Sequence, residues 1–401
     1  MQQSSQRRRV TVLGSTGSVG ANTLDVLARH PDRFEVFALG AATRVDEMFA
    51  QCVRFRPQHV VMASASHGRE LAQKIKQHGL KTEVHGSADA LEMIASHESV
   101  DCVMAAIVGA AGLASCLAAA RAGKHLLLAN KEALVVGGEL FLQAVAQGGA
   151  TLLPIDSEHS AIHQALPADR SGWSAQVEKI ILTASGGPFR QTAPEQLRDM
   201  TPAQACAHPT WTMGTKISVD SATMMNKALE VIEARYLFGL EPARIEVVIH
   251  PQSIVHSMVQ FRDTSVVAQL GTPDMRVPIA YGLGWPERLA SGAAALDFKA
   301  LPAMTFESID SNRHPERFPG LKLAWDALAA VPGTTAVLNA ANEVAVASFL
   351  DGRLRFDQIH DVNLHTLDAV TVREPRDLAD LLALDAEARR AAAAAVARIG
   401  R

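Results

Sequence analysis

Cysteine is scarce in this 401-residue chain, and its placement fits neither a disulfide framework nor a metal site. The four cysteines are Cys52, Cys102, Cys116 and Cys206, and no two of them have the close spacing of paired metal ligands. The His-Glu-x-x-His pattern of zinc hydrolases is also missing. We therefore expect a reducing compartment and, for any catalytic metal, an ion other than zinc.

An excess of one charge and long apolar runs are lacking as well. The 38 Lys and Arg residues nearly balance the 42 Asp and Glu residues, and the longest basic run is Arg7–Arg9, so no nucleic-acid partner is expected. No segment has the ~20 uncharged apolar residues that span a membrane, and the N-terminus lacks the hydrophobic core of a secretion signal. With 48% hydrophobic residues, the chain is expected to be globular, soluble and divided into two or three domains.

The first third of the chain alternates between strand and helix patterns. Val10–Leu13 predicts a strand, a helix follows to about Arg29, and Phe34–Leu39 predicts a second strand. This βαβ pattern indicates an α/β fold with a Rossmann-like, doubly wound parallel sheet. Three further strands are predicted, at His59–Met62, Cys102–Ala105 and His125–Leu128.

The pattern changes near residue 150 to strands that we expect to be antiparallel, with a tight turn near Asp263 before the last. Their sheet would suit pairing across a dimer interface. These strands are predicted at Val177–Thr183, Arg244–Ile249, Ser253–Phe261 and Thr264–Leu270. Proline and glycine then accumulate as in a linker, and the alanine-rich end predicts a helical bundle. The expected domains are a cofactor-binding domain at 1–150, a catalytic α+β domain at 151–285, a linker at 286–311 and a helical domain at 312–401.

A glycine-rich turn separates the first strand from the first helix. Gly14, Gly17 and Gly20 stand at three-residue intervals, and Thr16 and Ser18 add hydroxyl donors. Such a turn lets backbone N–H groups approach the pyrophosphate of a dinucleotide at the helix start. The alternative is an ordinary strand–helix turn that needs glycine for its backbone angles.

The end of the second strand indicates which dinucleotide is bound. An acidic residue is expected there for NAD, but this chain continues with Thr43 and Arg44. A guanidinium favours a 2′-phosphate and therefore NADP, although Arg44 as a simple surface cation is the alternative.

Three acidic residues are candidates for a metal site. Asp156 and Glu158 are two residues apart after an apolar run, so in extended chain they would point the same way. Together with Glu230 they would supply hard oxygen ligands, which suit magnesium or manganese. The alternative for the first pair is a solvated turn.

A helix-forming run leads up to Glu230. Asp220 or Ser221 is predicted to cap this helix, whose free N–H groups attract an anion. Asn226 and Lys227 precede Glu230 by four and three residues, which places them on its face of the helix. An amphipathic helix with one surface Lys/Glu pair is the alternative.

Together with the glycine turn and the Ser221 to Glu230 helix, several motifs make the chain similar to the 1-deoxy-D-xylulose 5-phosphate reductoisomerase family over nearly its full length. The motifs are Ala129–Glu132, Asp156–Glu158, Thr183–Pro188, His208–Gly214, Gly271–Arg276 and Leu338–Glu343. The resemblance implies rearrangement and reduction of 1-deoxy-D-xylulose 5-phosphate to 2-C-methyl-D-erythritol 4-phosphate in non-mevalonate isoprenoid synthesis. It further implies NADPH, a divalent cation (magnesium or manganese, with cobalt as a further candidate) and a cytoplasmic homodimer. Whether the rearrangement proceeds by fragmentation or by migration stays open.

The resemblance also implies roles for individual residues. The metal ligands would be Asp156, Glu158 and Glu230, which act in catalysis with Lys131 and His208. The substrate would be bound by Lys131, Ser157, Glu158, Ser185, His208, Trp211, Ser221, Asn226, Lys227 and Glu230. The cofactor would be bound by Gly14, Thr16, Gly17, Ser18, Val19, Ala42, Thr43, Arg44, Asn130, Glu132, Gly214 and Met275.

The family's closing flap corresponds to His208, Trp211 and Met213, for which the alternative is a packed loop. The chain departs from the family at Ala41–Arg44, where Ala-Gly-Lys-Asn is common, and at Thr215, where arginine is common. Two rival interpretations are a Rossmann dehydrogenase that only transfers hydride and a nicotinamide sensor without catalysis.

Overall fold

The computed structural model describes residues 7–211 and 213–400, which divide into two compact units. The first unit contains the chain up to Ala133 together with Phe141–Ser157 and Asp274–Ala294. The second unit contains Leu134–Leu140, Glu158–Pro273 and the chain from Ala295 onward. The domain boundaries expected at residues 150, 285 and 311 remain predictions.

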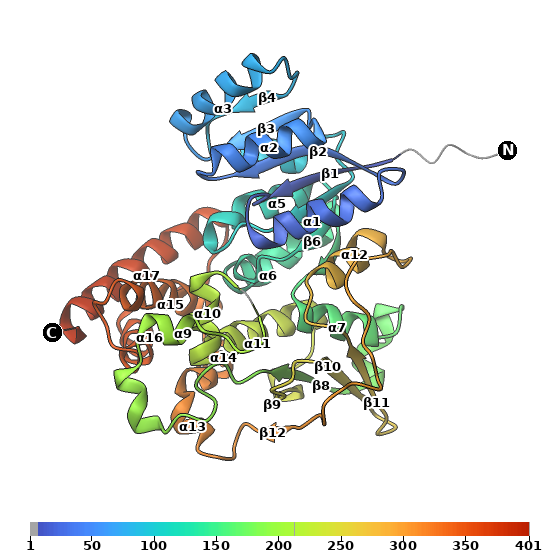
Figure 1. Ribbon diagram of the computed structural model, residues 1–401. Coiled ribbons are helices and arrows are strands. Elements are labelled where there is room, and N and C mark those ends of the chain that lie inside the picture. The colour runs from blue at the N-terminus through green and yellow to red at the C-terminus, as the bar shows by residue number, and fades with distance from the viewer. Residues whose placement is uncertain (1–6, 212, 401) are drawn as a thin grey trace. The chain divides into compact units, whose positions relative to one another are not determined.

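The first unit is built on a sheet of seven parallel strands in the order β4-β3-β2-β1-β5-β6-β7 (Figure 1). The predicted Rossmann-like sheet is thus confirmed, and the strand order reverses between β1 and β5, where such folds bind ligands. The strands β4 and β7 were not predicted. The strands are β1 Arg8–Leu13, β2 Phe34–Ala41, β3 His59–Met62, β4 Glu83–His85, β5 Cys102–Ala105, β6 His125–Leu128 and β7 Thr151–Pro154.

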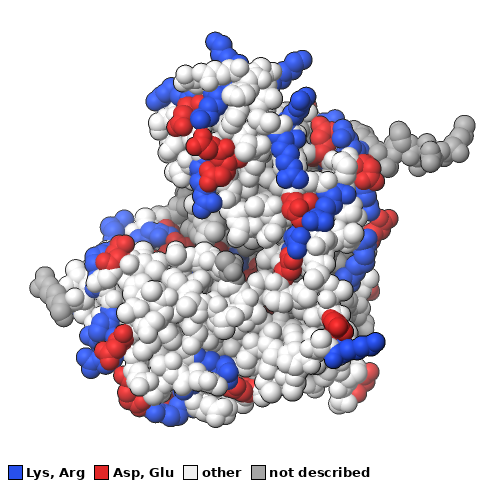
Figure 2. Space-filling view, in the orientation of Figure 1, with Lys and Arg blue, Asp and Glu red and all other residues white. Residues whose placement is uncertain are grey.

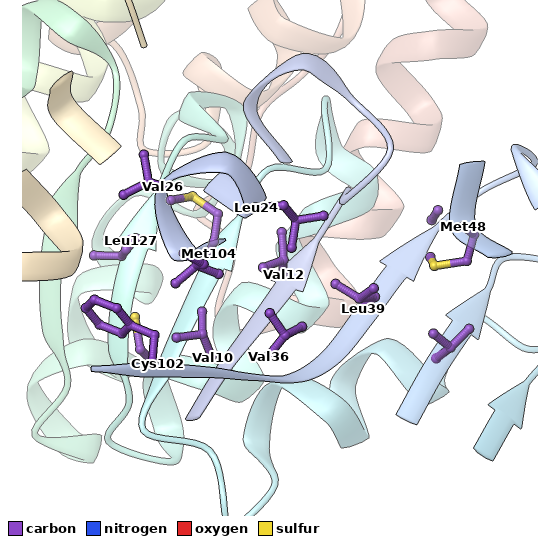
Figure 3. Close-up of a cluster of buried hydrophobic side chains, with 14 of the residues drawn as sticks. Val10, Val12, Leu24, Val26, Val36, Leu39, Met48, Cys102, Met104 and Leu127 are labelled. Carbon is purple, nitrogen blue, oxygen red and sulfur yellow. The ribbon is translucent and has the colours of Figure 1, made fainter. Parts of the chain in front are cut away.

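Helices cover both faces of this sheet. On one face, Val10 and Val12 of β1 and Met104 of β5 pack with Leu24 and Val26 of the first helix in a buried apolar cluster (Figure 3). Burial of these side chains is the main favourable term in folding. The helices are α1 Ser18–Arg29, α2 Val45–Phe55, α3 Ala65–Gln77, α4 Ala90–Ser96, α5 Leu113–Arg121, the start and end of α6 Lys131–Gly148, and α12 Arg276–Gly284.

Thr11 of β1 lies on the second face of the sheet. It alternates with Val10 and Val12 along β1, so it points to the opposite side of the sheet. There its hydroxyl donates to the carbonyl of Ile94 in α4 at 3.0 Å. The sheet is therefore covered by α1 and α12 on one side and by α4 on the other.

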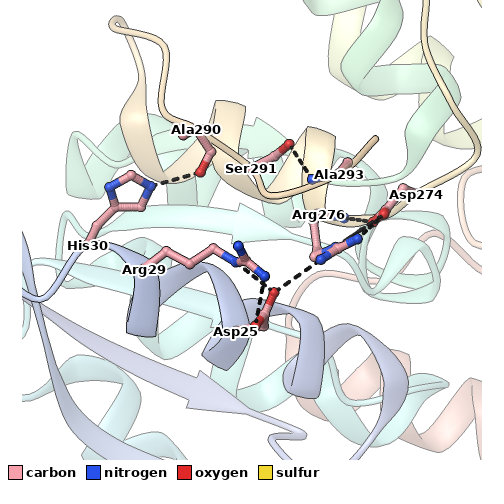
Figure 4. A network of polar contacts seen from close by, with 8 residues as sticks. All are labelled: Asp25, Arg29, His30, Asp274, Arg276, Ala290, Ser291 and Ala293. Atoms are coloured by element: carbon pink, nitrogen blue, oxygen red, sulfur yellow. Dashed lines mark hydrogen bonds and ion pairs between the residues drawn. The ribbon is translucent and has the colours of Figure 1, made fainter. Parts of the chain in front are cut away.

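The segment 274–294 is far from α1 in sequence but is fastened to it by polar contacts (Figure 4). Asp25 of α1 lies between Arg29, at 3.0 Å, and Arg276, at 3.4 Å. The Arg29 guanidinium makes the largest contribution to lowering the pKa of the Asp25 carboxyl, and Arg276 lowers this pKa further. His30 contacts the carbonyl of Ala290 at 2.8 Å.

The second unit contains a mixed sheet in the order β11-β10-β8-β9-β12. Its central strand β8 is antiparallel to β10 but parallel to β9, so the expectation of antiparallel pairing throughout is wrong for that pair. Several helices lie between β8 and β9, which gives the long crossover that a parallel pair requires. The turn near Asp263 is confirmed, because its carboxylate accepts from the Ser265 backbone at 2.9 Å. The strands are β8 Val177–Ala184, β9 Ile245–Ile249, β10 Val255–Phe261, β11 Val266–Leu270 and β12 Glu307–Ser308.

Helices make up the rest of the second unit, and α15, α16 and α17 form the predicted C-terminal bundle (Figure 1). Their core includes Ala341, Val346, Phe349 and Val362. The helices are α7 Ser157–Ala165, α8 Trp173–Gln176, α9 Pro202–Cys206, α10 Thr215–Thr223, α11 Met225–Phe238, α13 His314–Arg317, α14 Leu323–Ala329, α15 Thr334–Leu350, α16 Gln358–Ala369 and α17 Leu378–Ile399. Short 3-10 turns occur at 110–112, 170–172, 194–199, 242–244 and 319–322.

The surface agrees with the balanced composition. Basic and acidic side chains of the described residues are intermixed on the face shown in Figure 2. Within the described part of the chain, no helix has both the length and the apolar character needed to cross a membrane.

Candidate active site

The acidic centre of the second unit lies on α11. Glu230 is completely buried there and receives hydrogen bonds from Asn226 and Lys227, one helical turn earlier. The predicted common face of these three residues is therefore confirmed. The run is divided into two helices, however, because Met224 takes a left-handed backbone conformation, with φ at 62°, between α10 and α11.

The predicted helix cap at Asp220 or Ser221 is wrong. Because α10 begins at Thr215, both residues lie inside the helix. The buried Asp220 carboxylate instead accepts from Lys216 at 2.8 Å and from Asn342 of α15 at 2.7 Å. Asp220 therefore joins α10 to the C-terminal helices.

Glu158 comes to the same centre from α7. The helix begins at Ser157, so the expected extended chain through Asp156–Glu158 is wrong. A carboxylate in the first turn is favoured by the partial positive charge of a helix N-terminus. Glu158 and Glu230 each offer a carboxylate oxygen, and the two oxygens lie within 4.8 Å of each other.

Lys227 lies between these two carboxylates. Its ammonium donates to Glu158 at 2.9 Å and also to Glu230. Burial alone would lower the pKa of Lys227, but the two carboxylates outweigh burial and raise it. The second unit therefore brings together two acidic groups and one ammonium group, of which Glu230 and Lys227 are buried and Glu158 is partly exposed.

A buried His159–Glu233 pair lies next to this centre and was missed from the sequence. The two side chains are fully buried and 3.0 Å apart, and the other ring nitrogen of His159 is 2.9 Å from the carbonyl of Glu230. The pair thereby fixes the backbone at Glu230. The sequence feature that could have revealed this pair is the position of Glu233, three residues after Glu230 on the same helix.

Ser185 and Ser221, both predicted to bind the substrate, lie on either side of a glycine turn. A side chain at Gly187 would place its Cβ 2.6 Å from the carbonyl of Ser221, so only glycine fits. The backbone N–H of Gly187 donates to the Ser185 hydroxyl at 3.1 Å. The backbone of Gly187 therefore lies close to both Ser185 and Ser221.

His208 is in hydrogen-bonding distance of Ser185, at 2.9 Å. Burial lowers the pKa of His208, while the Glu158 carboxylate opposes part of this shift. The ring is therefore neutral at pH 7. Farther along the predicted flap, the Trp211 ring lies 6.5 Å from that of His256, and Met213 is half-buried. Residue 212 of the flap lies outside the described residues.

In the first unit, the glycine turn has the shape of an anion cradle. Gly14 has φ at 81°, and a Cβ there would lie 2.4 Å from the Ala106 carbonyl. A Cβ at Gly20 would lie 2.3 Å from the carbonyl of Gly14. Within the described chain no side chain caps the start of α1, so the first N–H groups of this helix are not satisfied by a side chain and suit an anion.

Arg44 extends back to this turn. Its guanidinium donates to the carbonyl of Thr16 at 3.0 Å, which places a cation at the end of β2 beside the glycines. Ala42, Thr43 and Arg44 are all exposed. This position is the one expected of a group that binds the 2′-phosphate.

Lys131 and Asp156 form a largely buried ion pair at the carboxyl ends of β6 and β7. The preceding Asn130 caps α6 by accepting from the backbone of Ala133 at 3.2 Å. Glu132 is buried in the first turn of α6. The remaining predicted contacts are Gly17 and Gly214, which precede α1 and α10, Ser18 and Val19 in the first turn of α1, Ser157 at the start of α7, and Met275, which packs on the core of the first unit before α12.

Comparison with known proteins identifies the family. Three family profiles match the chain: 1-deoxy-D-xylulose 5-phosphate reductoisomerase over residues 10–138, its C-terminal domain over 152–238, and the DXP reductoisomerase C-terminal domain over 270–391. The chain belongs to the 1-deoxy-D-xylulose 5-phosphate reductoisomerase family.

Curated members of the reductoisomerase family match the chain from end to end. The 1-deoxy-D-xylulose 5-phosphate reductoisomerase of Cupriavidus metallidurans is 57% identical, over 96% of this chain and 98% of its own length. That of Dechloromonas aromatica is 56% identical, over 96% of each chain. The family assignment therefore rests on the whole chain rather than on single motifs.

Solved reductoisomerase structures share the fold. A DOX-P reductoisomerase crystallised with NADPH, fosmidomycin and magnesium superposes with a TM-score of 0.93 at 43% identity, covering 97% of this chain and 98% of the other. The Zymomonas mobilis reductoisomerase in complex with NADPH gives 0.90 at 45% identity, covering 98% and 99%.

Proposed function

We propose that this chain converts 1-deoxy-D-xylulose 5-phosphate to 2-C-methyl-D-erythritol 4-phosphate, with NADPH and magnesium or manganese. The observation that carries the proposal is that carboxylate oxygens of Glu158 and Glu230 lie within 4.8 Å of each other. The chain is a member of the family, and it also has an anion cradle at the start of α1. A dehydrogenase that transfers only hydride has no need of such a paired acidic centre.

The donor atoms fit a hard divalent cation. Glu158 and Glu230 supply only carboxylate oxygens, and Asp156 precedes Glu158 by two residues, so we assign all three as ligands. The bound ion would act as a Lewis acid on adjacent substrate oxygens. Glu158 and Glu230 already accept hydrogen bonds from the ammonium of Lys227, so their carboxylates are arranged to receive positive charge.

The chain's own residues position the substrate. Ser185, Ser221, Asn226 and Lys227 would bind the phosphate, and the Gly187 backbone allows it to approach closely. Lys131, held by Asp156, would stabilise negative charge that develops on the substrate. Binding the remote phosphate in this way fixes the reacting carbons relative to the cofactor.

The cofactor contacts follow the glycine turn. Gly14, Gly17 and the first N–H groups of α1 would hold the pyrophosphate, and Arg44 would pair with the 2′-phosphate of NADPH. Asn130, Glu132, Gly214 and Met275 would complete the cofactor site. A flap formed by His208, Trp211 and Met213 would exclude water during turnover.

We further propose that the protein acts as a cytoplasmic homodimer in the isoprenoid pathway that does not use mevalonate. The support is family membership and, for the dimer, the mixed sheet of the second unit, whose edge strand β11 has exposed Val266 and Val267. Sedimentation analysis that found only monomers at assay concentrations would reject the dimer.

The decisive experiment follows the reaction by NMR with carbon-labelled 1-deoxy-D-xylulose 5-phosphate, NADPH and either metal. Formation of the branched product, with one NADPH consumed per product, would support the proposal. Reduction without rearrangement would favour a simple dehydrogenase, and no NADPH oxidation would favour a sensor. A thiol-dependent dehydrogenase is already disfavoured, because burial raises the pKa of Cys52, Cys102 and Cys116 to about 12.

A further inference from the structure

A cluster of histidine and glutamate side chains lies at the edge of the parallel sheet and takes no part in the proposed reaction. His59 begins β3, and Glu83 and His85 begin and end the neighbouring edge strand β4 (Figure 1). In the register of the two strands, His59 pairs with Glu83 and Val61 pairs with His85. Since side chains two residues apart share a face, all three project from the same side of the sheet.

The distances within this cluster suit ligands around one metal ion. His59 Nδ1 and His85 Nε2 are 3.3 Å apart. Glu83 Oε2 lies 3.5 Å from His59 Nδ1, and the other oxygen of the same carboxylate, Oε1, lies 3.7 Å from His85 Nε2. The two Glu83 distances are too long for good hydrogen bonds. Two nitrogens bound tetrahedrally at 2.0–2.1 Å from zinc are separated by about 3.3–3.4 Å, which matches the observed separation of the two histidine nitrogens. One ligand atom from each of the three residues lies within 4.8 Å of the others.

We propose that His59, Glu83 and His85 form a binding site for a divalent transition metal ion of the zinc class. Two imidazoles and one carboxylate are a donor set that suits zinc rather than magnesium. The site lies at the amino end of β3, whereas the glycine turn follows the carboxyl end of β1. A bound ion would fasten the three-residue edge strand β4 to the rest of the sheet.

The surroundings of the cluster favour metal binding. The side chains of His59 and His85 are 18% and 21% exposed and that of Glu83 is 64% exposed, so an ion can enter from solvent. The His97 ring, 5.7 Å away, and Phe37, 5.3 Å away, support the His59 ring.

The other charged and titratable groups close to His59 are Glu83, His85 and His97. His97 is not counted as a ligand, because its Nδ1 accepts from the backbone of Ser99 at 3.1 Å. The site therefore has three protein ligands and leaves room for water in the fourth position.

The test is a zinc titration of the untagged full-length protein in excess magnesium, followed by competition with a chromogenic chelator. His85→Gln and Glu83→Gln are compared with the wild type, and His365→Gln, which changes an exposed histidine elsewhere, is the control. We expect His85→Gln to weaken one zinc site by at least ~100-fold, because loss even of a residue that supports a ligand costs 10–100-fold. Zinc binding at the acidic centre is common to all four proteins and cancels in the comparison.

Cobalt provides a second readout, since tetrahedral Co²⁺ with nitrogen ligands absorbs strongly in the visible range. The wild type and His365→Gln should give this band, and the two cluster variants should lose it. Glu83→Gln changes a mostly exposed side chain, so it keeps the test valid if His85→Gln fails to fold. Equal zinc affinity in the wild type and Glu83→Gln, with no cobalt band in either, would overturn the proposal.

Discussion

The candidate sites of the two units differ in the groups that form them, which are backbone groups in the first unit and side chains in the second. In the first unit the cofactor cradle is mainly backbone, formed by Gly14, Gly20 and the uncapped start of α1. In the second unit the acidic centre consists of charged side chains, the buried Glu230 and Lys227 and the partly exposed Glu158. A backbone site depends on conformation, whereas a side-chain site depends on the charge of single residues.

This difference determines which substitutions each unit tolerates. A cradle of N–H groups survives most side-chain changes but fails where a Cβ collides with backbone. A buried charge cluster keeps its shape after an isosteric change, but it loses one charge that its function requires. The remaining charge is then left without its partner, which also costs stability. The predictions below test this contrast, beginning with the largest effect.

The largest effect is expected from Glu230→Gln. The substitution keeps the shape of the side chain but removes one proposed metal ligand, so kcat should fall at least ~1000-fold, or about 4 kcal/mol. Steady-state assays at saturating magnesium measure this, and NADPH binding should be unchanged. Glu246→Gln, which affects an exposed ion pair with Lys179, is the matched control. A loss below about tenfold would reject Glu230 as a ligand.

The next effect concerns the backbone site. Gly14→Ala should destabilise the fold by about 3 kcal/mol, because it adds a clash with the Ala106 carbonyl to the cost of a left-handed backbone. Gly79→Ala separates the two causes: its φ is 64°, but a Cβ there meets nothing within 4 Å, so about 1 kcal/mol is expected. Urea unfolding and NADPH titration measure both. Equal losses would show that the cradle has room for a side chain.

The pH dependence of stability should reflect a histidine of the second unit. Burial lowers the pKa of His163 to about 4, from 6.5. Because the native pKa is depressed, the stabilising contribution is complete above pH 6.5 and is lost as the pH falls towards 4, by at most ~3 kcal/mol. Chemical unfolding at pH 7 and pH 4.5 should show a smaller difference for His163→Gln than for the wild type. Parallel pH profiles would assign the acid sensitivity to other groups.

The smallest effect is expected at the edge of the cradle. Arg44→Ala should raise KM for NADPH about tenfold through loss of one charge-assisted contact, and leave KM for NADH nearly unchanged. Arg54→Ala, which removes an exposed arginine from α2, should not alter the ratio. If selectivity is the same with and without Arg44, that residue is a surface cation.

The parts of the structure that depend on local sequence were predicted well. The strands β3, β5 and β6 begin and end where their apolar runs do, and the turn at Gly14 was evident because close backbone approach requires glycine. The i,i+3 and i,i+4 relation of Lys227 and Asn226 to Glu230 followed from helix geometry alone. The substrate and most assigned roles came from the family resemblance.

The errors concern features set by distant contacts. The direction of Glu158 depends on where α7 begins after β7, and the parallel pairing of β8 with β9 depends on a long crossover. The His159–Glu233 pair forms only when α7 packs against α11. The strand β4 has three residues, too few for a periodic pattern.

The return of residues 274–294 to the first unit has a consequence for synthesis of the protein. Ile279 and Leu283 of α12 are completely buried in the same apolar cluster as Val10 and Val12. A nascent chain that ends before α12 therefore leaves one side of its N-terminal sheet covered only in part, by α1, even though all seven strands have been made. We therefore expect the core of the first unit to be completed only after the ribosome has translated past the acidic centre and α12.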